Sequence, residues 1–166
     1  TTMRMVAGVM RPDGGQVQID GVDVVAAPEQ GRHRVSYMPQ RFALYEDLTV
    51  DENIRFFADL FEVPRTLWRE RAARLLDASG MAPFRKRLAG QLSGGMKQKL
   101  GLTCALVHAP RVLLLDEPTT GVDPLSRRQF WQILYQLRAE GVALVISTAY
   151  LDEAERCDRL ALLNEG

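Results

Sequence analysis

The spacing of hydrophobic and polar positions changes twice along the chain. Near the amino end, residues 16–20 alternate between polar and apolar side chains, as a half-exposed strand does, and Asp20-Gly21 predicts a hairpin turn. From Thr49 the spacing becomes helical, and Thr49 with Glu52 has the sequence of a capping box. Beyond about residue 95, helical segments alternate with short apolar runs, which is typical of a parallel sheet wrapped by helices.

We therefore expect an α/β fold: a parallel sheet core with an antiparallel β edge and an inserted α-helical subdomain. Residues 1–48 and 92–166 form the core, and residues 49–91 form the helical subdomain. The expected helices are 3–10, two helices within 49–80, 95–108, 124–140 and 151–156; the expected strands are 16–20, 35–38, 111–115, 142–147 and 159–163.

Composition narrows the function classes. The 166 residues include 21 Lys+Arg and 21 Asp+Glu, so the chain lacks the basic excess typical of a general nucleic-acid binder, and no nucleic acid is expected as a partner. Cys104 and Cys157 lie far apart in the sequence, which argues against a disulfide framework or a zinc site. No apolar stretch approaches the roughly 18 residues of a spanning helix, so a membrane role requires a partner. A start at Thr1 without Met and an end at the turn 164–166 suggest an excerpt of a longer protein.

Two adjacent carboxylates follow the most apolar run of the chain. Residues 112–115 read as a strand buried on both faces, and they end in Asp116 and Glu117. Ligands of open α/β sheets gather at the carboxyl ends of strands, where Asp116 would hold a phosphate-bound Mg²⁺ and Glu117 would deprotonate the water attacking a γ-phosphate. The alternative is an acidic turn that caps the next helix.

A second candidate site opens the helix expected at 95–108. Ser93 suits an N-cap, and Gly94 and Gly95 leave backbone N–H groups open to a phosphate. The helix N-terminus adds partial positive charge, which makes an anion site. A plain Ser-Gly-Gly turn is the alternative for these residues taken alone.

Several segments together resemble the ATP-binding cassette family, in order along the whole chain. They are Leu92–Gln98 for the signature motif, Val112–Glu117 for the Walker B strand, Gln40 for the Q-loop, Gly121–Pro124 for the D-loop and Ile146–Ala154 for the switch segment. The resemblance implies a P-loop NTPase-type core with ATP and Mg²⁺ as cofactors. It is closest to ATPase subunits of bacterial multidrug-type exporters, especially the first half of tandem subunits.

The resemblance also implies a head-to-tail dimer with a second ATPase domain, docked on transmembrane permease subunits at the cytoplasmic face of the membrane. One ATP would contact the switch position and the catalytic and Mg²⁺-binding residues of this chain. The other ATP would contact the signature of this chain, which acts in trans. The implied catalytic and metal residues are Gln40, Asp116, Glu117 and position 149, and the implied trans residues are Ser93, Gly94, Gly95 and Gln98, with Asp123 at the interface. Gln40 could equally be an ordinary strand-end residue, whereas Asp123-Pro124 suits both an interface and a helix N-cap.

Two departures from the family pattern change what is expected of the chain. Thr1 aligns with the end of the Walker A loop, whose glycines and lysine are absent, so we expect this polypeptide to bind ATP weakly and not to hydrolyse it. Ala149 stands where the family has its switch histidine, and a methyl group cannot form that hydrogen bond. Either this is a naturally degenerate half-site that hydrolyses slowly beside a competent partner site, or the alanine was engineered.

Other functions remain open from the sequence. A soluble cassette translation factor and a non-hydrolysing nucleotide sensor are the rivals; the DNA-repair branch is set aside because only a short helical block separates Gln40 from Ser93. Remaining polar and aromatic residues have simpler interpretations: His33 and His108 as structural, Trp68 and Trp131 as packing residues, Arg85-Lys86-Arg87 as a solvated patch or partner contact, and Phe42, Leu44 and Tyr45 as core or as a groove for the transporter.

Overall fold

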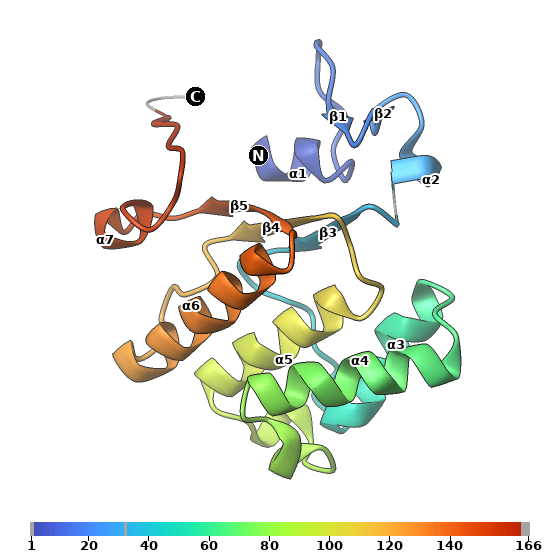
Figure 1. Cartoon of the computed structure of the whole chain (residues 1–166), viewed down its shortest axis with the longest axis vertical. Coiled ribbons are helices and arrows are strands. Elements are labelled where there is room, and N and C mark those ends of the chain that lie inside the picture. Colours follow the sequence, from blue (N-terminus) through green and yellow to red (C-terminus); the bar gives the residue numbers. More distant parts are fainter. Residues whose placement is uncertain (1, 32, 164–166) are drawn as a thin grey trace.

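A computed structural model describes residues 2–31 and 33–163, arranged as a parallel sheet between two helical layers (Figure 1). The sheet has the strand order β3-β4-β5, with α1 on one face and α5 and α6 on the other. The elements are β3 (Val35–Met38), β4 (Val112–Asp116), β5 (Ala143–Ser147), α1 (Thr2–Val6) on one face, and α5 (Gly94–Leu106) and α6 (Pro124–Ala139) on the other.

The central strand β4 pairs in parallel with both neighbours. Leu115 lies opposite Met38 of β3, and Asp116 lies opposite Ser147 of β5. Leu113, Leu114 and Leu115 are fully buried, as the continuous apolar run predicts for a strand covered on both faces. Because all three strands run the same way, their carboxyl ends lie along one edge of the sheet.

The expected antiparallel edge is a two-stranded hairpin, β1 (Gln18–Ile19) and β2 (Val22–Asp23), followed by α2 (Pro28–Gly31). Asp20 and Gly21 have φ of 51° and 76°, the left-handed pair that a two-residue hairpin turn of this kind requires. The predicted turn is confirmed, although the paired part of the strand is shorter than residues 16–20.

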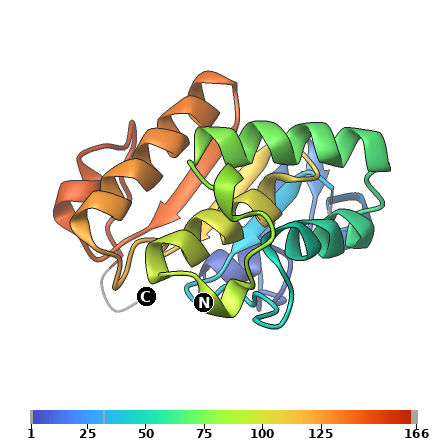
Figure 2. The ribbon, with the colours of Figure 1, turned by 90° about the horizontal axis from the view of Figure 1, so that it is seen from below.

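The inserted helical block contains α3 (Val50–Leu60), α4 (Arg65–Ala78) and two 3₁₀ turns, Ala82–Phe84 and Ala89–Gln91 (Figure 2). The capping box is confirmed: the Thr49 side chain accepts from the backbone N–H of Glu52, and the Glu52 carboxylate accepts from the Thr49 N–H. Inside the block, the amide of fully buried Asn53 donates to three backbone oxygens of the preceding loop, those of Tyr45, Leu48 and Thr49.

One helix is shared by two hydrophobic cores. Leu102, Ala105 and Leu106 of α5 pack with the sheet and α6, whereas Leu100 and Cys104 pack with α3 and α4. This is why residues 100–106 of α5 are all buried. The helical block is therefore joined to the sheet through α5.

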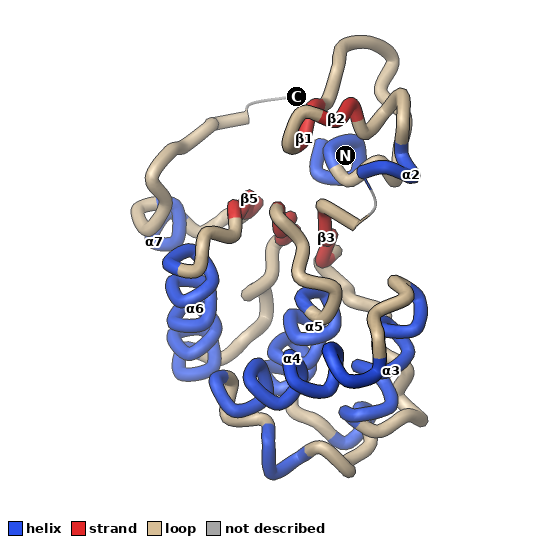
Figure 3. The backbone as a smooth tube through the Cα atoms, turned by 45° about the vertical axis from the view of Figure 1, so that its right-hand side comes forward, coloured by secondary structure: helices blue, strands red, loops and turns tan. Residues whose placement is uncertain are grey.

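One predicted element is wrong. The chain after α7 (Leu151–Ala154) forms no strand over its described residues 159–163, and Leu160, Leu162 and Leu163 are largely exposed (Figure 3). A strand needs a hydrogen-bonded neighbour, and the described residues supply none there. Separately, none of the helices in 2–31 or 33–163 is long and apolar enough to cross a membrane.

Candidate functional site

A hydrogen-bonded cluster of polar side chains follows the carboxyl ends of β3 and β4. The amide nitrogen Nε2 of Gln40 donates to Oε2 of Glu117 at 2.8 Å, across 77 positions of sequence. Thr120 Oγ1 donates to the same carboxylate oxygen at 3.2 Å. The sheet thus brings together the Q-loop and Walker B candidates, as parallel pairing of β3 and β4 requires.

Both oxygens of Asp116 accept hydroxyl hydrogen bonds from the neighbouring strands. Tyr37 of β3 donates to Oδ2 at 3.0 Å, and Ser147 of β5 donates to Oδ1. Burial raises the pKa of Tyr37, and the Asp116 carboxylate raises it further, so the phenol stays protonated and donates. These two hydroxyls fix the orientation of the Asp116 carboxylate.

The backbone at Glu117 is held in an unusual conformation. Its φ is +48°, in the left-handed region that non-glycine residues rarely occupy. Its N–H lies 3.0 Å from the carbonyl oxygen and 3.1 Å from Oγ of Ser147. Ser147 therefore contacts both the Asp116 carboxylate and the Glu117 backbone, and the strained turn directs the Glu117 side chain toward Gln40.

The switch segment leaves Ala149 exposed, two residues after Ser147. Tyr150, the aromatic that could compensate for a missing histidine, lies elsewhere: the guanidinium of Arg127 in α6 sits 4.3 Å from its ring centroid. The Tyr150 N–H donates to Thr148 Oγ1 at 3.1 Å.

The signature residues contact α6 instead of the carboxylate cluster. Ser93 is the N-cap of α5 and accepts from Met96 N–H at 3.3 Å. A methyl group added at Gly95 would lie 2.4 Å from Ser126 Oγ, whereas one at Gly94 would meet nothing within 4 Å. Gly95 thus permits close packing of α5 on α6, and Gly94 leaves the N-terminus of α5 open.

Asp123 begins α6 as an N-cap with Pro124 after it, as one interpretation predicted. Its side chain accepts from Ser126 N–H at 2.9 Å, and this hydrogen bonding lowers the pKa of Asp123. Ser126 is also the residue that packs on Gly95, so the signature and D-loop candidates meet at one contact between helix N-termini.

The remaining signature side chains face inward or along α5. Oε1 of Gln98 is buried and has no hydrogen-bond partner among the described residues. Lys97 pairs with Glu46 at 2.7 Å, which connects the signature helix to the loop after Gln40. Thr1 lies outside the described residues.

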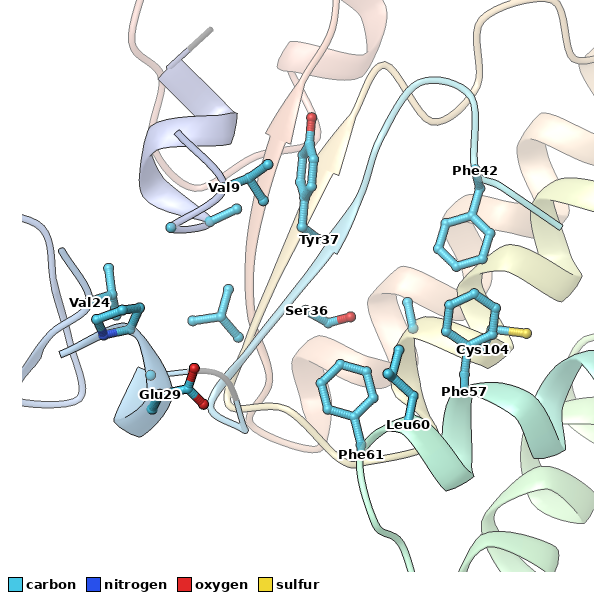
Figure 4. A pocket seen from close by; sticks show the side chains of 16 residues that line it. Val9, Val24, Glu29, Ser36, Tyr37, Phe42, Phe57, Leu60, Phe61 and Cys104 are labelled. Carbon is cyan, nitrogen blue, oxygen red and sulfur yellow. The ribbon is translucent and has the colours of Figure 1, made fainter. Parts of the chain in front are cut away.

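A cavity of about 390 Å³ lies elsewhere, between the hairpin, β3 and the helical block (Figure 4). Its walls are mainly apolar and include Phe42, Phe57 and Cys104. Of the predicted site residues, none lines it. The site is therefore the open edge of the sheet, where polar side chains meet, and not this cavity.

Sequence reasoning missed four side chains that act on the predicted ones: Tyr37 and Ser147 on Asp116, Thr120 on Glu117, and Glu153 under the switch segment. The contacts of Tyr37 and Ser147 follow from strand order and register, and a parallel arrangement of three strands was the signal that could have found them. Nothing in the sequence distinguishes buried Glu153 from exposed Asp152 beside it.

The chain is similar to known proteins in both sequence and fold. Residues 1–120 match the protein-family model described as ABC transporter. The chain is 52% identical over 166 residues to "Probable multidrug ABC transporter ATP-binding protein YbhF" of Escherichia coli strain K12, and this match covers 100% of the chain and 29% of that protein. It is 41% identical over 167 residues to "Daunorubicin/doxorubicin resistance ATP-binding protein DrrA" of Streptomyces peucetius, with 100% of the chain and 51% of that protein covered.

A solved ATP-binding subunit of an ABC transporter superposes with a TM-score of 0.80 at 30% sequence identity. The superposition covers 93% of the chain and 65% of that structure. The fold prediction is confirmed by this likeness. The chain spans 29% of the length of one curated relative and 51% of the other.

Proposed function

The chain belongs to the ABC transporter family, and we propose that it is an ATP-binding and ATP-hydrolysing unit that powers export of drugs or other small molecules. The names of both relatives, multidrug transport and daunorubicin/doxorubicin resistance, support export. The transported compound would be selected by membrane subunits.

The observation that carries the proposal is the hydrogen bond from Gln40 to Glu117 beside an oriented Asp116. In the proposed reaction, Glu117 accepts a proton at a carboxylate oxygen from the water that attacks the γ-phosphate. Gln40 orients that carboxylate and connects it to the loop leading into the helical block. Glu117 and Asp116 act separately because their side chains hydrogen-bond to different partners.

The residues present fit Mg²⁺. Asp116 and the amide oxygen of Gln40 would hold it, and each Asp116 oxygen keeps a lone-pair direction beyond its hydroxyl contact. The described residues contain no cluster of three or more His, Cys, Asp or Glu side chains for a metal, which agrees with an ion bound mainly through phosphate and water. When bound, Mg²⁺ neutralises charge on the β- and γ-phosphates.

We propose that Ser93 and Gly94 bind the ATP of a partner domain in a head-to-tail pair. The next residue, Gly95, packs on Ser126 of α6, whereas the position of Gly94 is open. The α5 N-terminus offers unpaired N–H groups to a phosphate. Asp123, at the same contact, would lie in the interface and link the two sites.

The surface proposed to dock on a permease begins after Gln40. Phe42 and Leu44 pack against the helical core, whereas Tyr45 is 46% exposed and packs at a tilted angle on Phe56, 40% exposed, with ring centroids 4.6 Å apart. Asn53 fixes the backbone of this loop. This rigid, exposed aromatic pair lies beside the Q-loop, so a permease bound to it would respond to changes at Gln40. The same contact would hold the chain at the cytoplasmic face of the membrane.

A non-hydrolysing nucleotide sensor is the second candidate, and Ala149 is the observation that favours it. Tyr150 is held by Arg127, and the methyl of Ala149 cannot hydrogen-bond to a phosphate. We further propose that a polypeptide of these 166 residues alone does not hydrolyse ATP, because it contains no Gly-Lys phosphate loop. In the complete protein the site with Glu117 would turn over slowly.

Single-turnover hydrolysis at the Glu117 site of the complete protein, assembled with its membrane subunits, separates the two candidates. Glu117→Gln removes the base at constant size and should lower the rate at least about 100-fold with ATP affinity unchanged. Glu140→Gln, a carboxylate paired with Arg74 on the opposite end of α6, is the matched control and should leave the rate unchanged. Ala149→His should raise the rate; if neither Glu117→Gln nor Ala149→His moves it, the site is a sensor.

A further inference from the structure

The switch segment contains a carboxylate with no contact to solvent. Glu153 of α7 is 0% exposed, whereas its neighbour Asp152 is exposed. An ionised carboxylate in such a place is costly unless donors surround it. Its role is not accounted for by the proposed chemistry at Glu117.

Three donors from three parts of the chain meet at Glu153. Thr119 Oγ1 donates to Oε1 at 2.5 Å, Trp131 Nε1 donates to Oε1 at 3.1 Å, and Thr148 Oγ1 donates to Oε2 at 2.7 Å. Arg127 Nε lies 3.8 Å from Oε1. Burial by itself raises the pKa of a carboxyl group, but these hydrogen bonds and the Arg127 charge hold the pKa of Glu153 below its usual value.

The donors come from the segments that carry the proposed chemistry. Thr119 is two residues after Glu117, in the turn that leaves β4, and Thr148 directly precedes Ala149. Arg127 follows Ser126, the residue that packs on Gly95 of the signature. One side chain therefore connects the Glu117 turn, the switch loop and the first turn of α6.

The switch loop is held from a second direction by the same residues. Thr148 Oγ1, while donating to Glu153, accepts from the N–H of Tyr150. The Tyr150 ring lies under Arg127. The methyl group of Ala149 cannot form a hydrogen bond that would anchor the loop, so the placement of the loop depends on these contacts.

We propose that Glu153 is a positioning residue that fixes the loop 147–150 against the turn after Glu117 and ties both to α6. The proposed placement of the loop follows from the contacts above alone. The effect of this placement on ATP hydrolysis rests on the proposed function. Loss of the carboxylate should release the loop while leaving the sheet in place.

Hydrogen exchange in the complete protein tests the geometry without reference to activity. Glu153→Gln keeps the size but turns an amide NH₂ toward hydroxyl and indole donors, so protection of residues 147–155 should fall at least about tenfold, with β4 unchanged. Thr119→Val removes one donor at nearly constant shape and should lower the same protection, which keeps the test available if Glu153→Gln does not fold. The matched control is Thr103→Val: Thr103 is 2% exposed against 1% for Thr119, but its hydroxyl donates within its own helix.

The kinetic test asks whether the loop positions the reaction. Thr119→Val and Glu153→Gln should lower the single-turnover rate at the Glu117 site about tenfold or more with ATP affinity unchanged, while Thr103→Val stays within about twofold. Unchanged exchange at 147–155 overturns the proposal outright. Increased exchange with an unchanged single-turnover rate overturns the positioning role alone, provided that Glu117→Gln still lowers that rate at least about 100-fold; if it does not, the proposed function itself has failed.

Discussion

Glu117 combines a strained backbone with the central chemical role proposed for the chain. Left-handed φ costs a non-glycine residue about 1–2 kcal/mol, and here the Ser147 contacts to its N–H hold it there. The strain aims the carboxylate at Gln40. Strain retained at one residue is expected where geometry matters more than stability.

This strain predicts opposite effects of one substitution on stability and on activity. Glu117→Gly removes the left-handed penalty, so its free energy of unfolding should exceed that of Glu117→Gln by about 1 kcal/mol, although both lack the base. Urea unfolding of the two variants measures the difference. A Glu117→Gly variant less stable than Glu117→Gln would show that the turn is not strained.

His108 predicts a pH dependence of stability. The ring stacks on Phe61 with centroids 3.8 Å apart, and burial lowers the pKa of His108 to about 4 from 6.5. Below pH 6.5, His108 is protonated in the unfolded chain but stays neutral in the folded chain. The free energy of unfolding therefore falls as the pH drops from 6.5 toward 4, by at most about 3 kcal/mol.

Denaturant unfolding between about pH 7 and pH 5 measures this pH dependence. Carboxyl groups with a lowered pKa, such as Glu153, change stability mainly below their usual pKa of 4.5, so they contribute little in this window. His108→Phe keeps a stacked ring and should flatten the slope in that window. An equal slope in the variant and the parent would rule out His108 as its source.

At the scale of elements, the contact between the N-termini of α5 and α6 joins the signature to the D-loop. A β-carbon at Gly95 would lie 2.5 Å from Ser126 Cβ, which no real packing tolerates, whereas Gly94 is open. Gly95→Ala should therefore cost about 1–3 kcal/mol of stability, and Gly94→Ala should cost almost nothing. Thermal unfolding of this pair measures it.

Ser126→Gly provides a control for the Gly95 prediction, because it removes Oγ and Cβ of Ser126, the two atoms that the new methyl group would overlap. The double variant Gly95→Ala, Ser126→Gly should regain at least half of the lost stability relative to Ser126→Gly alone. Equal losses for Gly94→Ala and Gly95→Ala would contradict the packing argument.

Elements with strong local signals could be predicted from the sequence. The capping box at Thr49 and Glu52, the hairpin at Asp20-Gly21 and the buried strand before Asp116 are each encoded by neighbouring residues. The strand expected at 159–163 depended on a neighbour that local pattern does not reveal, and it does not form. Likewise the hydroxyls on Asp116 and two of the three donors on Glu153, Thr119 and Trp131, come from residues tens of positions away, so only the three-dimensional arrangement places them.

At the scale of the whole molecule, the two halves of the proposed function lie on different parts of the fold. Gln40, Asp116 and Glu117 lie at the edge of the sheet, whereas Ser93 and Gly94 begin the helix that joins the sheet to the helical block. A head-to-tail partner would bring a second copy of each half opposite the first. We propose that the signature of this chain is intact and that its switch position, Ala149, is degenerate.

The central claim is that Ser93 serves a competent site on the partner, while the Glu117 site turns over slowly. Steady-state ATP hydrolysis by the complete protein with its membrane subunits tests it through Ser93→Arg, whose bulky cation blocks the α5 N-terminus. We expect Ser93→Arg to lower turnover at least about 100-fold, and Glu117→Gln to leave it nearly unchanged because the Glu117 site carries about a hundredth of the total or less. Turnover of Ser93→Arg equal to that of the parent protein would contradict the account.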